Sequence, residues 1–94
     1  MGRAESIMSN VRECYICHRQ GDLHLHHIYF GANRKHCDEE GCWCWLCPKH
    51  HNMSNEGVHF NRELDLKLKA ECQLRWERNG SREEFMKIFG RSWV

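Results

Sequence analysis

The sequence lacks several features that would place it in a large class of proteins. It has one proline, and no apolar run approaches the roughly 20 residues of a membrane-spanning helix. Its first residues contain no apolar stretch typical of a secretory signal, so we expect a cytoplasmic protein without membrane contact. Lys and Arg total 14 against 13 Asp and Glu, which excludes a purely electrostatic nucleic-acid binder. Any nucleic-acid contact must come from a local patch.

The chain is also too short to be stabilised by a large core. Its 94 residues allow one domain, and a domain of this size buries only about 60–65% of its unfolded surface. Against this, the sequence has seven cysteines and eight histidines. In a reducing compartment disulfides are disfavoured, and an odd number of cysteines cannot all pair within one chain. Metal binding is therefore the favoured interpretation.

Hydrophobic patterning predicts a small α+β domain that spans residues 1–94. Residues 1–12 show no periodicity and are expected to form a flexible tail. Two runs of strand-like composition, 23–30 and 42–46, are expected to pair as a hairpin. The hydrophilic residues 34–41 are predicted to form the loop between them.

The second half of the chain is predicted to be helical. Pro48 suits the first turn of a short helix, which residues 54–57 should end. Asn61 is a suitable N-cap for a long helix that continues to Arg78. The apolar residues that indicate a wide stripe on this helix are Leu64, Leu66, Leu68, Ala70, Cys72, Leu74 and Trp76. The stripe could serve the core or a homodimer.

A capping-box pattern predicts one more helix. Ser81 is followed three positions later by Glu84, and the helix should end near residue 89. Residues 61–89 thus make up a C-terminal helical part. Charges of both signs alternate along the long helix, which is typical of a solvated face.

Two pairs of residues have the spacing of a structural zinc site. Cys14 and Cys17 are separated by two residues, and so are Cys47 and His50. Structural zinc takes four tetrahedral Cys or His ligands, and a two-residue spacer lets one turn present two of them. We predict that these four residues bind zinc; the alternative is that the cysteines are small buried hydrophobic residues. Of the others, Cys37 is left open, and core packing is favoured for Cys42, Cys44 and Cys72.

A second group of histidines flanks these ligands in sequence. His26 and His27 lie in the first predicted strand, His51 directly follows a zinc ligand, and His59 lies further on. If zinc holds the hairpin against the short helix, His51 comes near the histidine pair and a histidine-rich site results. Neighbours in a regular strand point to opposite faces, so His26 and His27 share a site only at an irregularity or strand end. Taken singly, each is better explained as a surface or core residue with satisfied hydrogen bonds, and it is His27 and His51 together that favour the site.

The residues around these ligands resemble those of the HNH nucleases. The residues that carry the resemblance are Cys14, Cys17, His26, His27, Ile28, Gly31, Asn33, Arg34, Lys35, Leu46, Cys47, His50, His51, Asn52 and the run from Gly57 to Asn61. Nearly everything after residue 13 is similar to small HNH proteins of phages and integrated elements of Gram-positive bacteria. The resemblance implies a zinc-stapled, treble-clef-like ββα-metal hairpin and helix with C-terminal helices, and a DNA-cutting enzyme in the host cytoplasm.

The resemblance also implies roles for individual histidines. His27 would be the general base that activates a water molecule. His26 and His51 would be ligands of a catalytic divalent ion, and His59 would complete the site or contact the scissile phosphate.

The asparagine that normally orients the base has no counterpart, because residues 42–46 contain none. Asn33, Asn52 or a main-chain carbonyl are the candidates to replace it. Arg34 and Lys35 are candidate phosphate contacts, with Asn33 beside them, and an ordinary solvated loop is the alternative.

The chemistry of phosphodiester hydrolysis agrees with this hypothesis. It needs an activated water, a base, and positive charge for the phosphorane oxygens and the leaving group. Imidazole ligands favour Mn²⁺, Ni²⁺, Co²⁺ or Zn²⁺ over Mg²⁺, and all five ions are candidates. The alternative is a zinc-knuckle module that binds DNA or a protein without cleaving it. A metal-storage or redox protein is disfavoured, because the spacing of the ligand pairs is that of a structural metal site. A homodimer, or a phage or host DNA-processing partner, could supply targeting.

Overall fold

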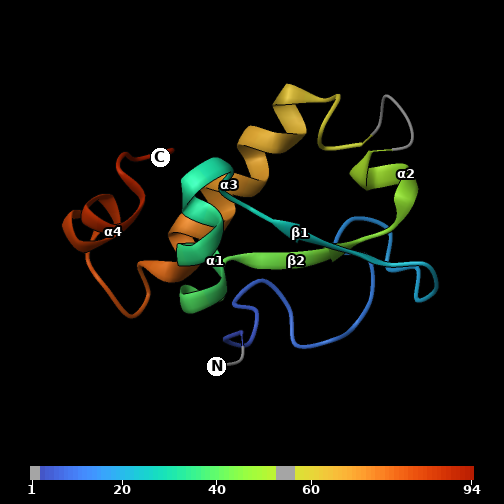
Figure 1. Ribbon diagram of the computed structural model, residues 1–94, viewed down its shortest axis with the longest axis horizontal. Coiled ribbons are helices and arrows are strands. Elements are labelled where there is room, and N and C mark those ends of the chain that lie inside the picture. Colours follow the sequence, from blue (N-terminus) through green and yellow to red (C-terminus); the bar gives the residue numbers. More distant parts are fainter. Residues whose placement is uncertain (1–2, 53–56) are drawn as a thin grey trace.

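The computed structural model describes residues 3–52 and 57–94. These residues form a small α+β fold with one two-stranded sheet, one 3-10 turn and four α-helices (Figure 1). The predicted helix break at residues 54–57 lies, except for its last residue, outside the described residues. No helix in the described part of the chain is long and apolar enough to cross a membrane.

The predicted hairpin is confirmed. Strands β1 (His24–His27) and β2 (Trp43–Leu46) pair antiparallel, so that His26 lies opposite Cys44. Both of these side chains are 2% exposed and lie on the covered face of the sheet. The first strand is shorter than the predicted run 23–30, because pairing with β2 ends where the chain turns into the next element.

The segment between the strands is helical, so the prediction of a loop at residues 34–41 is wrong. A 3-10 turn, η1 (Gly31–Asn33), leads into α1 (Arg34–Glu40). Gly41 ends α1 in the left-handed conformation, with φ 75°, and its N–H donates to the Cys37 carbonyl. Cys37 is the one buried side chain of this helix, so the sequence carries no visible apolar periodicity there.

The described part of the predicted tail, residues 1–12, packs against the domain instead of extending from it. The Ile7 N–H donates to the Gly41 carbonyl at 2.9 Å, and the Ser6 hydroxyl donates to the Trp43 carbonyl. These contacts satisfy backbone groups that a two-stranded sheet and a short helix leave unpaired. They involve residues far apart in sequence, which periodicity does not reveal.

Helix α2 (Pro48–His51) follows β2 directly, as predicted. The N–H groups of His50 and His51 both donate to the Cys47 carbonyl, at 3.1 and 3.0 Å. Consecutive residues of a helix leave its axis about 100° apart. The two histidines of this helix therefore reach different neighbours.

The two C-terminal helices begin where their caps predict. Asn61 caps α3 (Arg62–Trp76), and its side chain accepts the Leu64 N–H at 3.1 Å. Ser81 starts α4 (Arg82–Phe89) with the predicted capping box. Local capping chemistry is thus sufficient to locate both helix starts.

The buried face of α3 differs from the predicted stripe. Its buried side chains are Leu68, Lys69, Cys72 and Gln73. Leu66 and Leu74 are exposed instead. Gln73 is accommodated because its side chain accepts the Trp93 N–H at 2.7 Å and donates to the Ser92 hydroxyl at 2.9 Å.

The core gathers buried side chains from β2, α1, α3 and α4. It includes the three cysteines that were assigned to it, and Cys37 as well. Tyr29 lies at its centre, packs against Phe85 and Phe89, and donates its hydroxyl to the Lys69 carbonyl at 2.7 Å.

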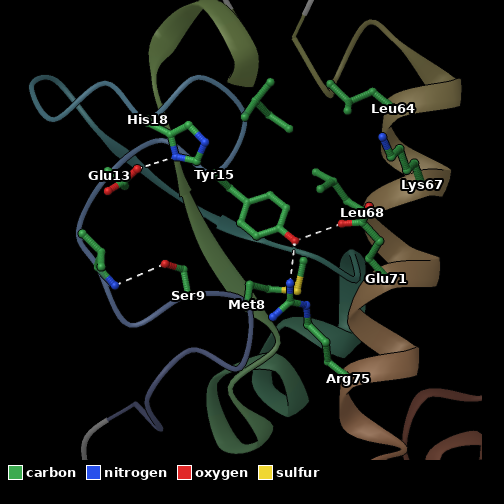
Figure 2. A pocket seen from close by; sticks show the side chains of 12 residues that line it. Met8, Ser9, Glu13, Tyr15, His18, Leu64, Lys67, Leu68, Glu71 and Arg75 are labelled. Carbon is green, nitrogen blue, oxygen red and sulfur yellow. Dashed lines mark hydrogen bonds and ion pairs between the residues drawn. The ribbon is translucent and has the colours of Figure 1, made fainter.

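A polar network attaches the N-terminal region to α3 beside a pocket of about 660 Å³ (Figure 2). The Tyr15 ring points toward α3, where its hydroxyl donates to Glu71 at 2.9 Å and accepts from Arg75 at 3.2 Å. No predicted metal ligand lines this pocket. The contacts of Tyr15 with Glu71 and Arg75 hold the segment around Tyr15 in place.

Candidate metal centres

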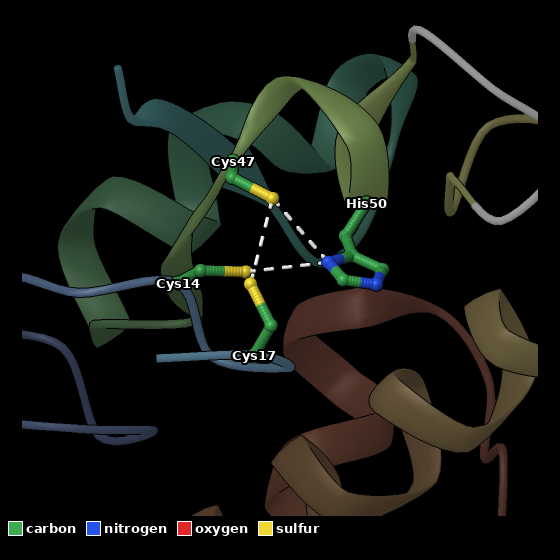
Figure 3. Close-up of side chains that lie close together, drawn as sticks. All are labelled: Cys14, Cys17, Cys47 and His50. Atoms are coloured by element: carbon green, nitrogen blue, oxygen red, sulfur yellow. Dashed lines mark hydrogen bonds between the residues drawn. The ribbon is translucent and has the colours of Figure 1, made fainter. Parts of the chain in front are cut away.

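The four predicted zinc ligands converge on one point (Figure 3). The Cys17 and Cys47 sulfurs are 3.7 Å apart, and the His50 Nδ1 lies 3.3 Å from the Cys47 sulfur and 3.7 Å from the Cys14 sulfur. A tetrahedral zinc ion about 2.3 Å from each sulfur sets S···S separations of about 3.8 Å. The side chains thus stand at the corners that a metal ion such as zinc requires, and we call them the Cys₃His centre.

Backbone hydrogen bonds hold the first ligand pair. The His18 N–H donates to the Cys14 carbonyl at 2.8 Å, which closes a tight turn with His18 at a positive φ of 67°. The Tyr15 N–H donates to the Trp45 carbonyl at 2.8 Å and fixes the turn to β2. Because the chain reaches Cys47 directly after β2, this contact brings both ligand pairs to the same end of the sheet.

Backbone hydrogen bonds favour the thiolate form of Cys14. Burial raises the pKa of Cys14, but backbone N–H groups of Cys17, Cys47 and Ile16 together outweigh it and lower that pKa to about 6. Metal ions bind the thiolate form of cysteine. A metal ion held by these four side chains would have no open coordination position, which is the arrangement found in structural sites.

A second cluster lies on the other side of α2. One ring nitrogen from each of His26, His51 and His59 falls within 4.8 Å of the others. The Nε2 atoms of His51 and His59 are 3.1 Å apart, and the His59 N–H donates to the His51 carbonyl at 3.1 Å. We call these three residues the histidine centre.

His26 gives the clearest indication of a ligand-binding role. It is 2% exposed, and its Nε2 is the one buried side-chain nitrogen or oxygen without a hydrogen-bond partner in the described chain. A buried polar atom without a partner costs about 1–3 kcal/mol. Burial lowers the pKa of His26 to about 3 and that of His51 to about 4, so both rings are neutral near pH 7 and offer lone pairs. These donors fit a divalent transition metal.

The histidine centre borders a pocket of about 210 Å³. The residues that line it are Leu25, His26, His27, Phe30, Arg34, His51 and His59. Three protein nitrogens leave coordination positions open, which is the arrangement of catalytic rather than structural metal sites. The structure therefore brings the predicted ligands, the predicted base and one predicted phosphate contact around a single pocket.

The side chain of His27 has a partner that the sequence did not reveal. Its Nε2 lies 2.9 Å from Asp38 Oδ1, and the Arg3 Nε donates to the same oxygen at 2.6 Å. The Arg3 hydrogen bond lowers the pKa of Asp38, and the contact with His27 lowers it further. Asp38 lies on α1, the helix that was not predicted, so no sequence signal pointed to this pair.

The other candidates have different environments. The Asn33 side chain donates to the Phe89 carbonyl at 3.1 Å, so its amide connects η1 to the end of α4. Asn52 is exposed at the end of α2, and neither asparagine is the contact recorded for His27. Lys35 is exposed on α1 and does not line the histidine pocket.

His24 was also missed. Its Nδ1 lies 3.0 Å from the Nδ1 of His51, with ring centroids 5.1 Å apart. The available signal was its spacing of two residues from His26, which places both side chains on the same face of β1.

Fold and site together define a small α+β protein with two clusters able to hold metal ions. No family model, curated protein or solved structure matches the chain.

Proposed function

We propose that this protein is a metal-dependent endonuclease of the HNH type that hydrolyses phosphodiester bonds in DNA. The observation that carries the proposal is the histidine centre, whose buried His26 Nε2 has no partner and whose pocket also contains His27 and Arg34. The order of β1, β2 and α2 around this centre is consistent with a ββα-metal motif.

The Cys₃His centre binds structural zinc in this proposal. Zinc connects the turn at Cys14 to the start of α2, which carries one ligand of each centre. Structural zinc contributes on the order of 10 kcal/mol of folding free energy in small domains. The ion therefore fixes the helix from which His51 reaches the second centre.

His26, His51 and His59 would hold a divalent ion, which would supply Lewis-acid stabilisation at the scissile phosphate. His27 takes the proton of the attacking water. Its Nε2–H donates to Asp38, which leaves Nδ1 as the proton acceptor.

Arg34 supports the reaction from the rim of the pocket. Its side chain lines the pocket, and a planar guanidinium with several N–H donors is well suited to phosphate oxygens. Such a local contact fits a chain whose formal net charge is only +1.

A plasmid assay tests the proposal. Purified zinc-loaded protein is incubated with supercoiled plasmid and Mn²⁺, Ni²⁺, Co²⁺, Zn²⁺ or Mg²⁺, and nicked and linear products are quantified. The wild type should cut with at least one of these ions, and His27→Ala should reduce the rate by about 10² to 10⁴-fold. His36→Ala is the matched control, because His36 lies on α1 and does not line the pocket.

Two outcomes contradict the proposal. One is an intact plasmid with every ion, and DNA retention in a gel shift would then favour a non-catalytic zinc-knuckle module. The other is unchanged cleavage by His27→Ala. Zinc content and circular dichroism of each variant ensure that loss of cleavage is not loss of fold.

A further inference from the structure

His51 has a neighbour at each of its two ring nitrogens. Its Nε2 lies 3.1 Å from His59 within the histidine centre, and its Nδ1 lies 3.0 Å from the Nδ1 of His24. His24 is not one of the three residues whose ligand atoms converge on a common point. The ring of His51 therefore stands between the histidine centre and a fourth imidazole.

The position of the single proton on a neutral imidazole decides which nitrogen donates a hydrogen bond and which one can bind a metal ion. One nitrogen carries the proton and donates, while the other has a lone pair. A metal ion at the histidine centre requires the lone pair of His51 on Nε2, so the proton must be on Nδ1. Nδ1–H then needs an acceptor, and the Nδ1 of His24 is the atom at hydrogen-bonding distance. Metal-binding histidines generally donate their second N–H to such a partner.

The register of the hairpin explains why His24 reaches this position. His24 pairs with Leu46, the last residue of β2, and α2 begins two residues later. His24 and His26 lie on the same face of β1, because they are two residues apart. One strand face therefore provides both a ligand of the centre and the neighbour of a second ligand.

We propose that His24 is a positioning residue of the histidine centre: its Nδ1 accepts the Nδ1–H of His51 and thereby directs the Nε2 lone pair of His51 toward His26 and His59. The inference rests on the metal binding in the proposed function, but it does not depend on DNA cleavage.

Two substitutions separate hydrogen bonding from packing. His24→Ala removes the acceptor. His24→Asn keeps one, because the Asn side-chain oxygen can occupy the place of the imidazole Nδ1. Loss of such an outer partner typically costs 10 to 100-fold in metal affinity, so we expect that loss for His24→Ala and recovery of most of it for His24→Asn. His36→Ala again serves as the control.

The experiment is a titration of the zinc-loaded protein with Co²⁺, monitored by visible absorption. Co²⁺ bound to thiolates and Co²⁺ bound to imidazoles have different spectra, so the titration shows which centre the ion enters. Ring-nitrogen NMR shifts of the zinc-loaded protein before Co²⁺ is added report which nitrogen of His51 carries the proton. The wild type should bind Co²⁺ at the imidazole ligands and carry the His51 proton on Nδ1. Loss of affinity in His24→Ala with recovery in His24→Asn supports the inference.

Three results overturn it: equal Co²⁺ affinity in His24→Ala and the wild type, an Asn variant no better than the Ala variant, or a His51 proton on Nε2. Absence of Co²⁺ from the imidazole ligands overturns it together with the metal part of the proposed function. If Co²⁺ affinity depends on His24 but no plasmid is cut, the nuclease proposal fails and the role of His24 stands.

Discussion

The Cys₃His centre and the histidine centre share one short helix but differ in what they leave open. Helix α2 gives His50 to the first centre and His51 to the second. The first has four ligands, three of them thiols, whereas the second has three imidazoles beside a pocket. Two neighbouring residues of one helical turn thus belong to different sites. His50 belongs to a site with the ligand set of a structural metal, and His51 to a site that leaves coordination positions open.

The two centres also differ in how the protein prepares them. Backbone N–H groups lower the pKa of Cys14, so one ligand of the Cys₃His centre favours its charged form before a metal arrives. At the histidine centre burial keeps His26 and His51 neutral and leaves one ring nitrogen unpaired. Thiolate ligands would offset the positive charge of a bound cation. Neutral imidazole ligands would not, so an ion at the histidine centre would retain its full charge toward a substrate.

The largest effect is expected from His50→Ala, which removes one ligand of the Cys₃His centre. Structural zinc contributes on the order of 10 kcal/mol, comparable to the whole stability of a small domain. The variant should lose zinc and lack a cooperative thermal transition. Zinc analysis and circular dichroism measure this, and a folded, zinc-free His50→Ala protein would show that the Cys₃His centre is not structural.

His51→Ala changes the next residue of the same helix and should have a different effect. The fold and the zinc should remain, while binding of the second ion and DNA cleavage should be lost. A rate loss of at least about 10²-fold is expected, because in the proposed function the ion would supply the main charge stabilisation at the phosphate. If His51→Ala unfolds as His50→Ala does, the two centres are not separable.

Asp38→Ala tests a smaller contribution at the histidine pocket. Asp38 lies 2.9 Å from the Nε2 of His27, so in the proposed function its loss should misplace the base and slow cleavage by up to about 10²-fold. Co²⁺ affinity should not change. Glu39→Ala, at the next residue of α1, is the control, and equal cleavage by the two variants would refute the role of Asp38.

The smallest effects are expected from substitutions of Asn33 and Arg34, which should change different properties of the protein. Asn33→Ala removes the hydrogen bond to the Phe89 carbonyl and should lower the free energy of unfolding by about 1 kcal/mol without changing DNA cleavage. Arg34→Ala should weaken cleavage and leave the stability unchanged, because Arg34 is exposed at the pocket. Urea unfolding and the plasmid assay measure both, and the reverse pattern contradicts this assignment.

The features that the sequence predicted correctly depend on residues close together in the chain. The spacing of Cys14 and Cys17, and of Cys47 and His50, identified the Cys₃His centre because each pair lies on one turn. Asn61 and Ser81 located helix starts for the same reason, since a cap bonds to backbone within its own first turn.

The features that were missed depend on tertiary contacts. Helix α1 buries only Cys37, so its sequence shows no apolar period, and without this helix Asp38 had no predicted place beside His27. Gln73 lies on the buried face of α3, where the predicted stripe had placed Leu74. Its amide can be buried there because Ser92 and Trp93, far along the chain, form hydrogen bonds with it. Such partners are defined only after the chain has folded.

The central claim is that this chain holds two metal ions in two different environments. Anomalous scattering from crystals of zinc-loaded protein soaked in Mn²⁺ or Co²⁺ tests it most directly. The account predicts a zinc peak among Cys14, Cys17, Cys47 and His50, and a peak of the soaked ion among His26, His51 and His59. A zinc peak alone, with no soaked ion at the histidines, would contradict it.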